Sequence, residues 1–513
     1  MLSTVYSAGL FGIDGFPVTV EVDARPNLPS FELVGLPDMA VKEAKERVRT
    51  ACENSGLRFP ETSLMINLAP ADRRKEGSGF DLAILTGILH AVGVIRHTVP
   101  LEDSCFIGEL SLSGRLRGVR GVLCMRAAAR EAGFQNVYVP TENAAEAAAV
   151  RGIRVYAVES MTALLDHLNG RKPLTPLSTG ETVSDDELYV GLDFADVRGQ
   201  AMAKRALEIA AAGGHNVLLI GPPGTGKSML AKRLPSILPP LTFEEALTTT
   251  KIHSVAGLLP DGHALVTRRP FRSPHHTMSA VSLVGGGANP APGEISLAHN
   301  GVLFLDELPE FPKQVTDALR QPLEDFKVTI TRASGRVTFP SAFMLVAAMN
   351  PCRCGYFGHP TRKCTCRSGD VARYLANVSG PMLDRMDIQI ELPSLSFDEI
   401  SAADPHAESS ATIRARVTAA RAFARARMAA ENDQPRCNAQ LSPAEVHRYC
   451  RATDGAIALL KQAYDALGLS ARGHDRILRV ARTVADLDAS EHIREEHIAQ
   501  AIQMRSLDRK YWH

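Results

Sequence analysis

The central part of the chain is marked by short runs of apolar residues with no polar position inside them. These runs are Val217-Leu218-Leu219-Ile220, Val302-Leu303-Phe304-Leu305 and Phe343-Met344-Leu345-Val346-Ala347-Ala348. A strand that is buried on both faces reads as such a continuous run, whereas a strand with one face in water alternates apolar and polar residues. The runs therefore predict an α/β domain in which helices cover both faces of a parallel sheet.

The first third of the chain has a different, mixed pattern. Strand-like runs at residues 18–22 and 31–34 alternate with helical stretches at residues 40–54 and 81–93. This alternation predicts a separate mixed α/β domain that extends to about residue 170.

The end of the chain has a helical period throughout. Apolar residues recur there at the spacing of a single helix face, namely at Ile413, Val417, Ala420, Ala424 and Met428. A second face of the same helix carries Arg414, Arg421 and Arg425, and we interpret that face as solvated surface. The pattern predicts an all-helical C-terminal part.

Two polar segments without periodicity divide the chain. Residues 171–188 are rich in Pro, Ser, Thr and acidic residues, which is typical of a linker, and residues 401–410 form a second polar break. A chain of 513 residues is also too long for one hydrophobic core. We therefore predict a domain at residues 1–170, a linker at 171–188, a central domain at 189–397 and a helical part at 398–513.

Composition narrows the cellular setting. The 57 basic and 57 acidic residues cancel, so a nucleic-acid partner would have to be held by local patches of charge. No apolar run approaches the roughly 18 residues of a membrane helix, and the first residues lack the basic segment of an export signal. Nine cysteines, four of them clustered, fit a reduced protein better than a disulfide scaffold. We expect a cytoplasmic protein without membrane contact.

The first apolar run leads directly into a glycine-rich loop, Gly221-Pro222-Pro223-Gly224-Thr225-Gly226-Lys227-Ser228, and then into a helical stretch. A loop of this kind between a strand and a helix lets successive backbone N–H groups point at phosphates, and the helix N-terminus adds partial positive charge. Lys227 would reach the β- and γ-phosphates, and the Ser228 hydroxyl would ligate Mg²⁺. The loop predicts a site for a nucleoside triphosphate.

The second apolar run ends in two adjacent carboxylates, Asp306 and Glu307. Ligands bind beyond the carboxyl ends of parallel strands, so both side chains would emerge beside the phosphate loop. Asp306 would then hold Mg²⁺, and Glu307 would polarise the attacking water. The chain has no Asn-Lys-x-Asp motif for reading guanine, which disfavours a GTPase.

Longer motifs give the chain a family resemblance. They are Arg269-Pro270-Phe271-Arg272-Ser273-Pro274-His275-His276, Pro292-Gly293-Glu294-Ile295-Ser296-Leu297-Ala298-His299-Asn300, Met349-Asn350-Pro351-Cys352-Arg353-Cys354-Gly355 and Gly380-Pro381-Met382-Leu383-Asp384-Arg385-Met386-Asp387. With these motifs, essentially the whole chain resembles the ComM/YifB family of magnesium-chelatase-like AAA+ ATPases. The resemblance implies ATP and Mg²⁺ as cofactors and a ring-shaped homo-hexamer that binds ATP between subunits.

The same resemblance assigns roles to three further residues. Asn350 resembles the sensor-1 residue, whose neutral amide orients the hydrolytic water. Arg385 resembles the arginine finger that reaches the γ-phosphate of the neighbouring subunit; the alternative is a surface ion pair with an adjacent aspartate. Arg472 resembles sensor 2 of a helical lid, and Arg476 and Arg479 on the next turns are alternatives for that role.

The resemblance further implies a Lon-protease-like fold for residues 1–170. Lon proteases use a Ser–Lys dyad. Here the nucleophile position falls on Gly79, next to Ser78, and the lysine position falls on Leu123. A serine without a base stays a weak nucleophile. We therefore expect a non-proteolytic domain that binds DNA or supports the oligomer.

Two basic segments are candidates for DNA contact. The family places an insertion in helix 2 between the phosphate loop and Asp306, where this chain has Arg268, Arg269, Arg272 and the triplet Gly285-Gly286-Gly287. A pore loop and a surface loop are both open interpretations of this insertion. Downstream, the runs at residues 327–332 and 336–339 flank Ala333-Ser334-Gly335 and predict a hairpin, with Lys327 at its base and Arg332 and Arg336 at its tip. Basic tips inside a ring are placed to grip phosphates.

Four of the cysteines form two close pairs, Cys352 with Cys354 and Cys364 with Cys366, around a turn-forming loop. Such pairs would close a tetrahedral structural Zn²⁺ site, although the C-x-C spacing is tighter than the usual C-x₂-C. Four reduced thiols, or a three-cysteine site with His359, are the alternatives. The other five cysteines read as small core residues.

Three functions remain open at this stage. The first is an ATP-driven DNA motor, a helicase or branch-migration enzyme that acts on single-stranded and branched DNA with recombination proteins, and so promotes integration of DNA by homologous recombination during natural transformation. The second is the ATPase subunit of a magnesium chelatase, which would generally lack the Lon-like domain and the cysteine cluster. The third, a non-enzymatic assembly factor, is disfavoured because Asp306, Glu307 and Arg385 are all present.

Overall fold

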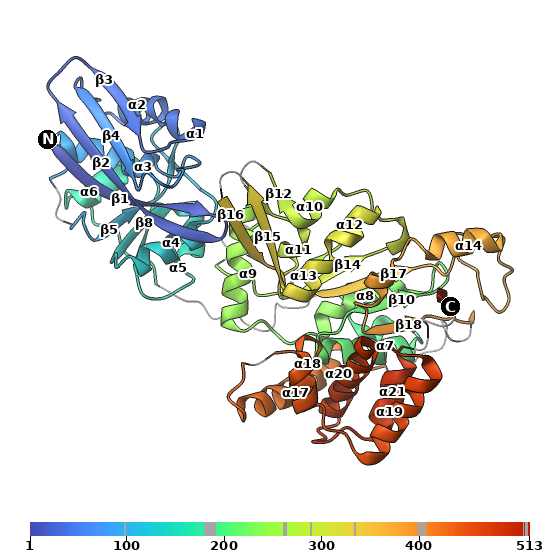
Figure 1. Ribbon diagram of the computed structural model, residues 1–513. Coiled ribbons are helices and arrows are strands. Elements are labelled where there is room, and N and C mark those ends of the chain that lie inside the picture. The colour runs from blue at the N-terminus through green and yellow to red at the C-terminus, as the bar shows by residue number, and fades with distance from the viewer. Residues whose placement is uncertain are drawn as a thin grey trace.

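The computed structural model describes residues 1–96, 99–178, 191–259, 264–287, 290–332, 335–397, 399, 407–434, 436–505, 507 and 511–512. Within these ranges the chain forms an N-terminal α/β domain, a central α/β domain and a C-terminal helical domain, seen from upper left to bottom in Figure 1. Most of the predicted linker and of the second polar break, residues 179–190 and 401–406, lies outside the described residues.

The N-terminal domain is built on a seven-stranded mixed sheet with the order β3-β4-β2-β1-β5-β8-β9. The strands are β1 (Leu2–Phe11), β2 (Asp14–Arg25), β3 (Ser30–Val34), β4 (Ser63–Ala69), β5 (Ser104–Phe106), β8 (Asn136–Pro140) and β9 (Arg154–Val158), and β6 (Glu109–Leu110) pairs with β7 (Leu116–Arg117). The helices are α1 (Met39–Lys42), α2 (Ala44–Asn54), α3 (Asp81–Ala91), α4 (Val122–Glu131), α5 (Ala144–Ala148) and α6 (Met161–Leu168). The strands and helices predicted from the sequence here are confirmed, except that Glu43 separates α1 from α2.

The central domain contains the predicted parallel sheet, with the order β11-β14-β17-β10-β18. Its strands are β10 (Val217–Ile220), β11 (Phe271–Arg272), β14 (Val302–Leu305), β17 (Met344–Met349) and β18 (Ile388–Glu391). The first strand in the chain, β10, lies between the fourth and the fifth, so the strand order reverses beside it. Ligands of open α/β sheets bind at such a switch point, beyond the carboxyl ends of the strands.

Helices cover both faces of this sheet, as the apolar runs predict. They are α7 (Ala201–Gly213), α8 (Lys227–Ile237), α9 (Phe243–Ala256), α10 (Ala280–Val284), α11 (Glu294–Leu297), α12 (Lys313–Ala318), α13 (Arg320–Asp325), α14 (Ser368–Leu375) and α15 (Gly380–Leu383). Alternate residues of one strand enter different cores: Leu219 joins the cluster shared with the C-terminal domain, and Leu218 joins the cluster on the other face. The predicted hairpin is present as β15 (Lys327–Arg332) and β16 (Gly335–Pro340), and a two-residue ladder joins β12 (Gly285–Gly286) to β13 (Ala291–Pro292).

The C-terminal domain is helical, as predicted. It comprises α17 (Ser410–Ala429), α18 (Pro443–Tyr449), α19 (Asp454–Leu467), α20 (Ala471–Leu487) and α21 (Glu495–Gln503). The predicted apolar face of α17 is buried at all five positions, and it packs against α7, α8 and α20 beneath the central sheet (Figure 1). The interpretation of its arginine face is wrong for Arg421, which is only 9% exposed.

In the described part of the chain, the N-terminal domain contacts the central domain around the β15–β16 hairpin and around α9. The turn between β1 and β2 lies against the β15–β16 hairpin: a Cβ at Gly335 would come within 2.9 Å of the Phe11 ring, and Ile13 packs on the core cluster beneath the hairpin. At the second place Ser254 of α9 donates a hydrogen bond to Glu146 of α5. In Figure 1 the β15–β16 hairpin and α9 both lie on the side of the central domain that faces the N-terminal domain.

No helix in the described part of the chain combines the length and the apolar character that crossing a membrane requires.

Candidate nucleotide site

The glycine-rich loop has the strand–loop–helix setting that the sequence predicts. Strand β10 ends at Ile220 and helix α8 begins at Lys227. Gly224 and Gly226 have φ values of +82° and +89°, a region that L-residues with a side chain seldom enter. A Cβ at Gly224 would meet no atom within 4 Å, so the space over the loop is open. The curled backbone thus leaves room for an anion at the start of α8.

Lys227 lies under this loop, and within the described residues no anionic group is bonded to it. Its Nζ donates to Gly221 O at 2.6 Å, to Pro222 O at 2.9 Å and to Asn350 Oδ1 at 3.1 Å. The residue is only 8% exposed, and this desolvation lowers the pKa of Lys227 to about 8 although the charge of Asp306 opposes the effect. A buried ammonium that has lost hydration gains from an anion beside it. This is the fit expected for the phosphates of a nucleotide.

The carboxylate pair that follows β14 lies beside the phosphate loop, because β14 and β10 belong to the same parallel sheet. Asp306 follows β14, and its Oδ2 accepts a hydrogen bond of 2.6 Å from the Ser228 hydroxyl at the start of α8. A carboxylate and a hydroxyl in contact are the protein ligands that Mg²⁺ takes in sites of this kind. Asn350 is brought to the same place because β17 pairs with β10 in register, Met349 beside Ile220.

Glu307 is held by a residue that the sequence did not assign. Its backbone is left-handed, with φ +55°, and its carboxylate lies 3.4 Å from Nδ1 of His276. Both side chains are partly exposed. The two adjacent histidines at the end of the Arg269–His276 motif stand out in the sequence. The sequence does not show that His276 lies beside Glu307, because that contact depends on how the segment after β11 returns to β14.

The four clustered cysteines converge in space. Their sulfur atoms all lie within 4.8 Å of one another, and those of Cys352, Cys354 and Cys364 are separated by 3.4 to 3.7 Å. Tetrahedral Zn–S bonds of about 2.3 Å would place the sulfurs about 3.8 Å apart. Desolvation opposes ionisation of Cys354, but backbone N–H groups of Tyr356 and Thr365 lower the pKa of its thiol to about 5. The donor set therefore fits Zn²⁺.

The three-cysteine alternative with His359 has no support in the geometry. The Nε2 atom of His359 pairs with the Ser394 hydroxyl at 2.9 Å, and its Nδ1 accepts from the backbone N–H groups of Thr361 and Arg362. The cysteine cluster instead borders the nucleotide site. Cys352 follows Asn350 by two residues, and the Cα of Gly355 lies so close to the Pro223 ring that a Cβ would clash with it.

The two remaining arginine candidates lie outside this cluster of residues. Arg385 is 12% exposed, and it donates to Arg320 O at 3.1 Å, to Pro381 O at 2.7 Å and to the carboxylate of Glu324. Arg472 is exposed in the first turn of α20. Its alternative, Arg476, is engaged at 3.7 Å with both Asp384 and Asp387.

The structure corrects part of the expected DNA surface. Arg269 is 6% exposed and donates to Pro239 O, Asn300 O and the Glu245 carboxylate, so its guanidinium holds the domain together and is not presented to a ligand outside. Arg272 forms a two-bonded ion pair with Glu294, at 2.6 and 2.7 Å. Arg268 in the same segment is exposed.

The hairpin keeps its basic residues at the surface. Lys327, Arg332 and Arg336 are all exposed. The backbone of the tip, however, contacts the N-terminal domain through Phe11, which nothing in the local sequence indicates. In that domain Ser78 donates to the Glu109 carboxylate, and the only lysine nearby in the chain, Lys75, donates to two backbone carbonyls.

Comparison with known proteins places the chain among relatives of matching length. Residues 193–400 match the family described as "Magnesium chelatase, subunit ChlI", and residues 20–143 and 407–505 match two further families, for subunit ChlI of Mg-chelatase and for its C-terminal part. The protein YifB of Salmonella typhimurium is 42% identical over 100% of this chain and 98% of its own length. The competence protein ComM of Haemophilus influenzae is 42% identical over 99% and 98%.

A much weaker similarity reaches a Lon protease. Lon protease 2 of Bacillus subtilis is 28% identical over 129 residues, which is 25% of this chain and 22% of that protein. The matches to YifB and ComM, by contrast, extend over nearly the whole length of both proteins at 42% identity. With the phosphate loop, the carboxylate strand and the parallel sheet in place, the chain belongs to the ComM/YifB family of magnesium-chelatase-like AAA+ ATPases.

Proposed function

We propose that this protein is an ATPase that works as a ring-shaped DNA motor. The observation that carries the proposal is the convergence of Lys227, Ser228, Asp306 and Asn350 at the switch point of the parallel sheet, with Glu307 beside them. The relative named as a competence protein supports a role in which imported DNA is processed. Helicase or branch-migration activity that promotes integration by homologous recombination during natural transformation is the specific form we propose.

Each residue of the site has one task in this proposal. The loop from Gly221 to Gly226 and the Lys227 ammonium would hold the phosphates of ATP, and Ser228 with Asp306 would hold Mg²⁺. When bound, Mg²⁺ neutralises charge that builds up on the phosphates. Glu307 would accept a proton from the attacking water, and Asn350, already bonded to Lys227, would orient that water.

We propose a homo-hexamer with shared sites, which the family and the position of Arg385 support. In the single chain Arg385 is bonded to Glu324 and two carbonyls and to nothing in the phosphate loop. Its use would therefore be in the neighbouring subunit, where a guanidinium stabilises transition-state charge. Arg472 on α20 would sense the nucleotide from the C-terminal domain, which we propose acts as the AAA+ lid.

Single-stranded and branched DNA are the proposed substrates, and recombination proteins the proposed partners. Lys327, Arg332 and Arg336 on the hairpin and Arg268 in the helix-2 insertion are the exposed cations that we assign to DNA phosphates. Contacts of this kind carry binding that does not depend on sequence and that weakens with salt. We further propose a non-proteolytic Lon-like N-terminal domain, residues 1–170, joined by a linker at 171–188 to a core at 189–397 and a lid at 398–513.

A structural Zn²⁺ bound by Cys352, Cys354, Cys364 and Cys366 completes the proposal. The Phe357 N–H donates to the Cys352 sulfur at 3.3 Å, as backbone amides do around metal-bound thiolates. Zn²⁺ would fix the loop that packs on Pro223 and so hold the phosphate loop in shape. A chelatase ATPase subunit is the second candidate, because the matched families are named for magnesium chelatase.

The deciding experiment measures ATP turnover with and without forked or four-way DNA. A DNA motor is expected to hydrolyse ATP faster with branched DNA and to move the branch point, whereas a chelatase subunit would respond to a porphyrin-binding partner and not to DNA. Lys227→Ala should weaken nucleotide binding, and Glu307→Gln should retain binding and lose turnover. Full turnover in Glu307→Gln would refute the assignment of the water-activating residue.

A further inference from the structure

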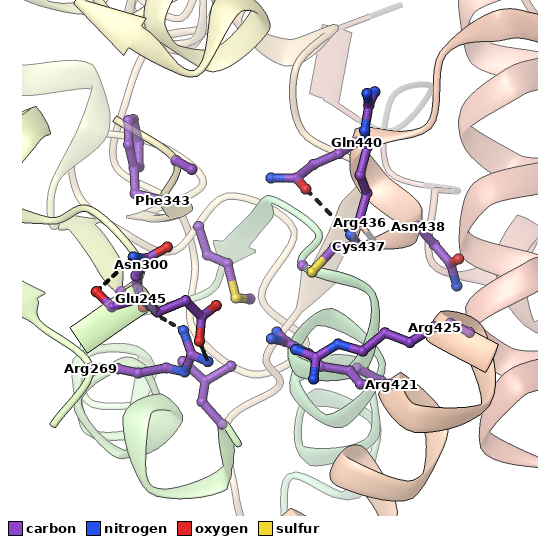
Figure 2. Close-up of a pocket in the computed structure, with 17 residues that line it drawn as sticks. Glu245, Arg269, Asn300, Phe343, Arg421, Arg425, Arg436, Cys437, Asn438 and Gln440 are labelled. Atoms are coloured by element: carbon purple, nitrogen blue, oxygen red, sulfur yellow. Dashed lines mark hydrogen bonds and ion pairs between the residues drawn. The ribbon is translucent and has the colours of Figure 1, made fainter. Parts of the chain in front are cut away.

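A cavity of about 250 Å³ lies between the central domain and the C-terminal domain. Gly214, Gly301 and Phe343, which precede β10, β14 and β17, line its floor, and residues of α17 and of the segment that follows α17 line the opposite wall (Figure 2). Because the nucleotide site is at the carboxyl ends of the same strands, the cavity opens at the other edge of the sheet. It is therefore a separate place from the phosphate loop.

The charges around this cavity are unbalanced. Four arginines line it, and Glu245 is the only carboxylate among the lining residues; the arginines are Arg269, Arg421, Arg425 and Arg436. Glu245 is already used, because Arg269 binds it at 3.0 Å. Arg436 approaches the carboxylate of Glu445, outside the lining, at 3.7 Å. Two of the four arginines, Arg421 and Arg425, therefore remain to be balanced.

Arg421 and Arg425 come from the arginine face of α17, and neither forms an ion pair within 4.0 Å in the described part of the chain, although Arg421 is close enough for its charge to act on Glu245. Arg421 is 9% exposed, and it donates through Nε and one terminal nitrogen to Ala211 O, at 3.0 and 2.6 Å. Arg425 one turn later is exposed. Both side chains extend from the helix toward Glu245 and Arg269 across the cavity (Figure 2).

Burying a guanidinium without a carboxylate is costly, because charged groups give up their hydration. The cost is visible at the facing arginine: desolvation, and next the charge of Arg421, hold the pKa of Arg269 below its usual value. An anion placed between the two walls would relieve both effects. Guanidinium groups bind phosphate oxygens in planar, two-bonded geometry, which favours a phosphate over a carboxylate of the same charge.

We propose that this cavity binds a small phosphate-bearing anion, held by Arg421 and Arg425 of the C-terminal domain against Asn300 and Phe343 of the central domain. The size fits one or two phosphate groups and little more, since pockets for drug-sized ligands begin at roughly 300 Å³. An anion here touches both domains and so stabilises one arrangement of the lid relative to the core. The site is independent of whether ATP turnover drives DNA movement.

The test uses the full chain with Lys227→Ala, so that binding in the phosphate loop is weakened equally in every sample. Inorganic pyrophosphate is titrated calorimetrically without Mg²⁺. One site per chain is expected, with affinity that falls as salt rises. Adding Arg425→Glu should weaken binding by at least about tenfold, because a charge-assisted contact becomes a repulsion. Arg421→Gln should do the same.

Arg414→Gln is the matched control, since it removes a positive charge from the same helix but does not line the cavity. The affinity of the Arg414→Gln variant for pyrophosphate should equal that of the parent. Arg425→Glu changes an exposed side chain and keeps the test valid if Arg421→Gln fails to fold. Equal pyrophosphate binding in Arg425→Glu and the parent would overturn the proposal, as would no binding at millimolar pyrophosphate. It is also overturned if Arg425→Glu weakens only binding of single-stranded oligothymidylate, because the surface would then belong to nucleic acid.

Discussion

The depressed pKa of Lys227 makes nucleotide binding depend on pH in a way that can be measured. Desolvation lowers this pKa from 10.5 to about 8, and the phosphates of a nucleotide would restore a high value. Below pH 8 the lysine is charged with or without nucleotide, so binding exchanges no proton with Lys227. Above pH 8 each binding event must first take up one proton, and affinity falls by about tenfold for each further pH unit.

The magnitude follows from the same pKa values. The difference between 8 and 10.5 corresponds to about 3 kcal/mol, at roughly 1.4 kcal/mol for each pH unit. A lysine whose folded pKa lies below the unfolded value destabilises the fold while it is protonated. This cost is fully present below pH 8, declines as pH rises from 8 to 10.5, and is absent above that range. Bound nucleotide removes the cost at every pH.

The assay is calorimetric titration of ADP between pH 7 and pH 9.5 in two buffers that differ in ionisation enthalpy. The proton uptake per ADP should rise from near zero to near one, and affinity at pH 9.5 should be about 30-fold below that at pH 7. Lys227→Met should abolish the uptake, whereas Lys232→Met, which removes an exposed lysine from the same helix, should preserve it. Flat affinity and zero uptake up to pH 9.5 in the parent would refute the reasoning.

Three further results are expected. Purified protein should contain one Zn²⁺ per chain, and Cys364→Ser should lose the metal and weaken ADP binding; metal analysis that finds no Zn²⁺ in protein never exposed to chelator contradicts this. Mixing Lys227→Ala with Arg385→Ala subunits should restore some ATP turnover through a minority of intact sites, and its absence in rings shown to be mixed counts against a finger acting in trans. The double variant Arg332→Ala and Arg336→Ala should lower the slope of log affinity for DNA against log salt by roughly one to two units. It should also abolish branch migration while basal ATP turnover survives. Branch migration equal to that of the parent would show that the hairpin is not the DNA-engaging element.

Local pattern was sufficient to predict most of the elements. The continuous apolar runs gave the parallel strands because a strand between two helical layers has no wet face, and the apolar period of α17 predicted its buried face correctly. The hairpin was visible because a glycine-containing turn separates two alternating segments. These features depend on neighbours within a few residues, and the sequence displays such neighbours directly.

The features that sequence reasoning missed depend on contacts between distant segments. Arg421 belongs to a face with Arg414 and Arg425, and only the approach of α7, whose Ala211 carbonyl accepts its bonds, shows that it is buried. Arg269 was expected to face DNA, but its partners lie in the segments around residues 239 and 300. The sequence alone does not show whether the hydrogen-bond donors of an arginine are bonded to water or to a backbone carbonyl.

The residues of the candidate nucleotide site could be predicted from motifs. The contacts that connect this site to the C-terminal domain could not. Arg385 and Asp387 share one short segment after α15. Asp387 accepts one hydrogen bond from the backbone N–H of Asn216, just before β10, and also pairs with His215 and with Arg476 on α20. A change in the angle of the C-terminal domain would therefore pull, through Arg476, on the segment that carries Arg385.

The hydrogen bonds that Arg385 forms within its own chain bear on this linkage. Its guanidinium donates to Glu324 and to two carbonyls, so in the proposed ring Arg385 would exchange these bonds for the phosphate of a neighbour. The exchange is favourable only where the neighbouring site holds an anion, because charge-assisted bonds must replace those that are lost. Removing the competitor with Glu324→Gln should raise turnover at low ATP if release of Arg385 limits the rate, and should leave turnover unchanged if it does not. Movement of the C-terminal domain and release of the finger would then be one event, which provides a route from nucleotide state in one subunit to catalysis in the next.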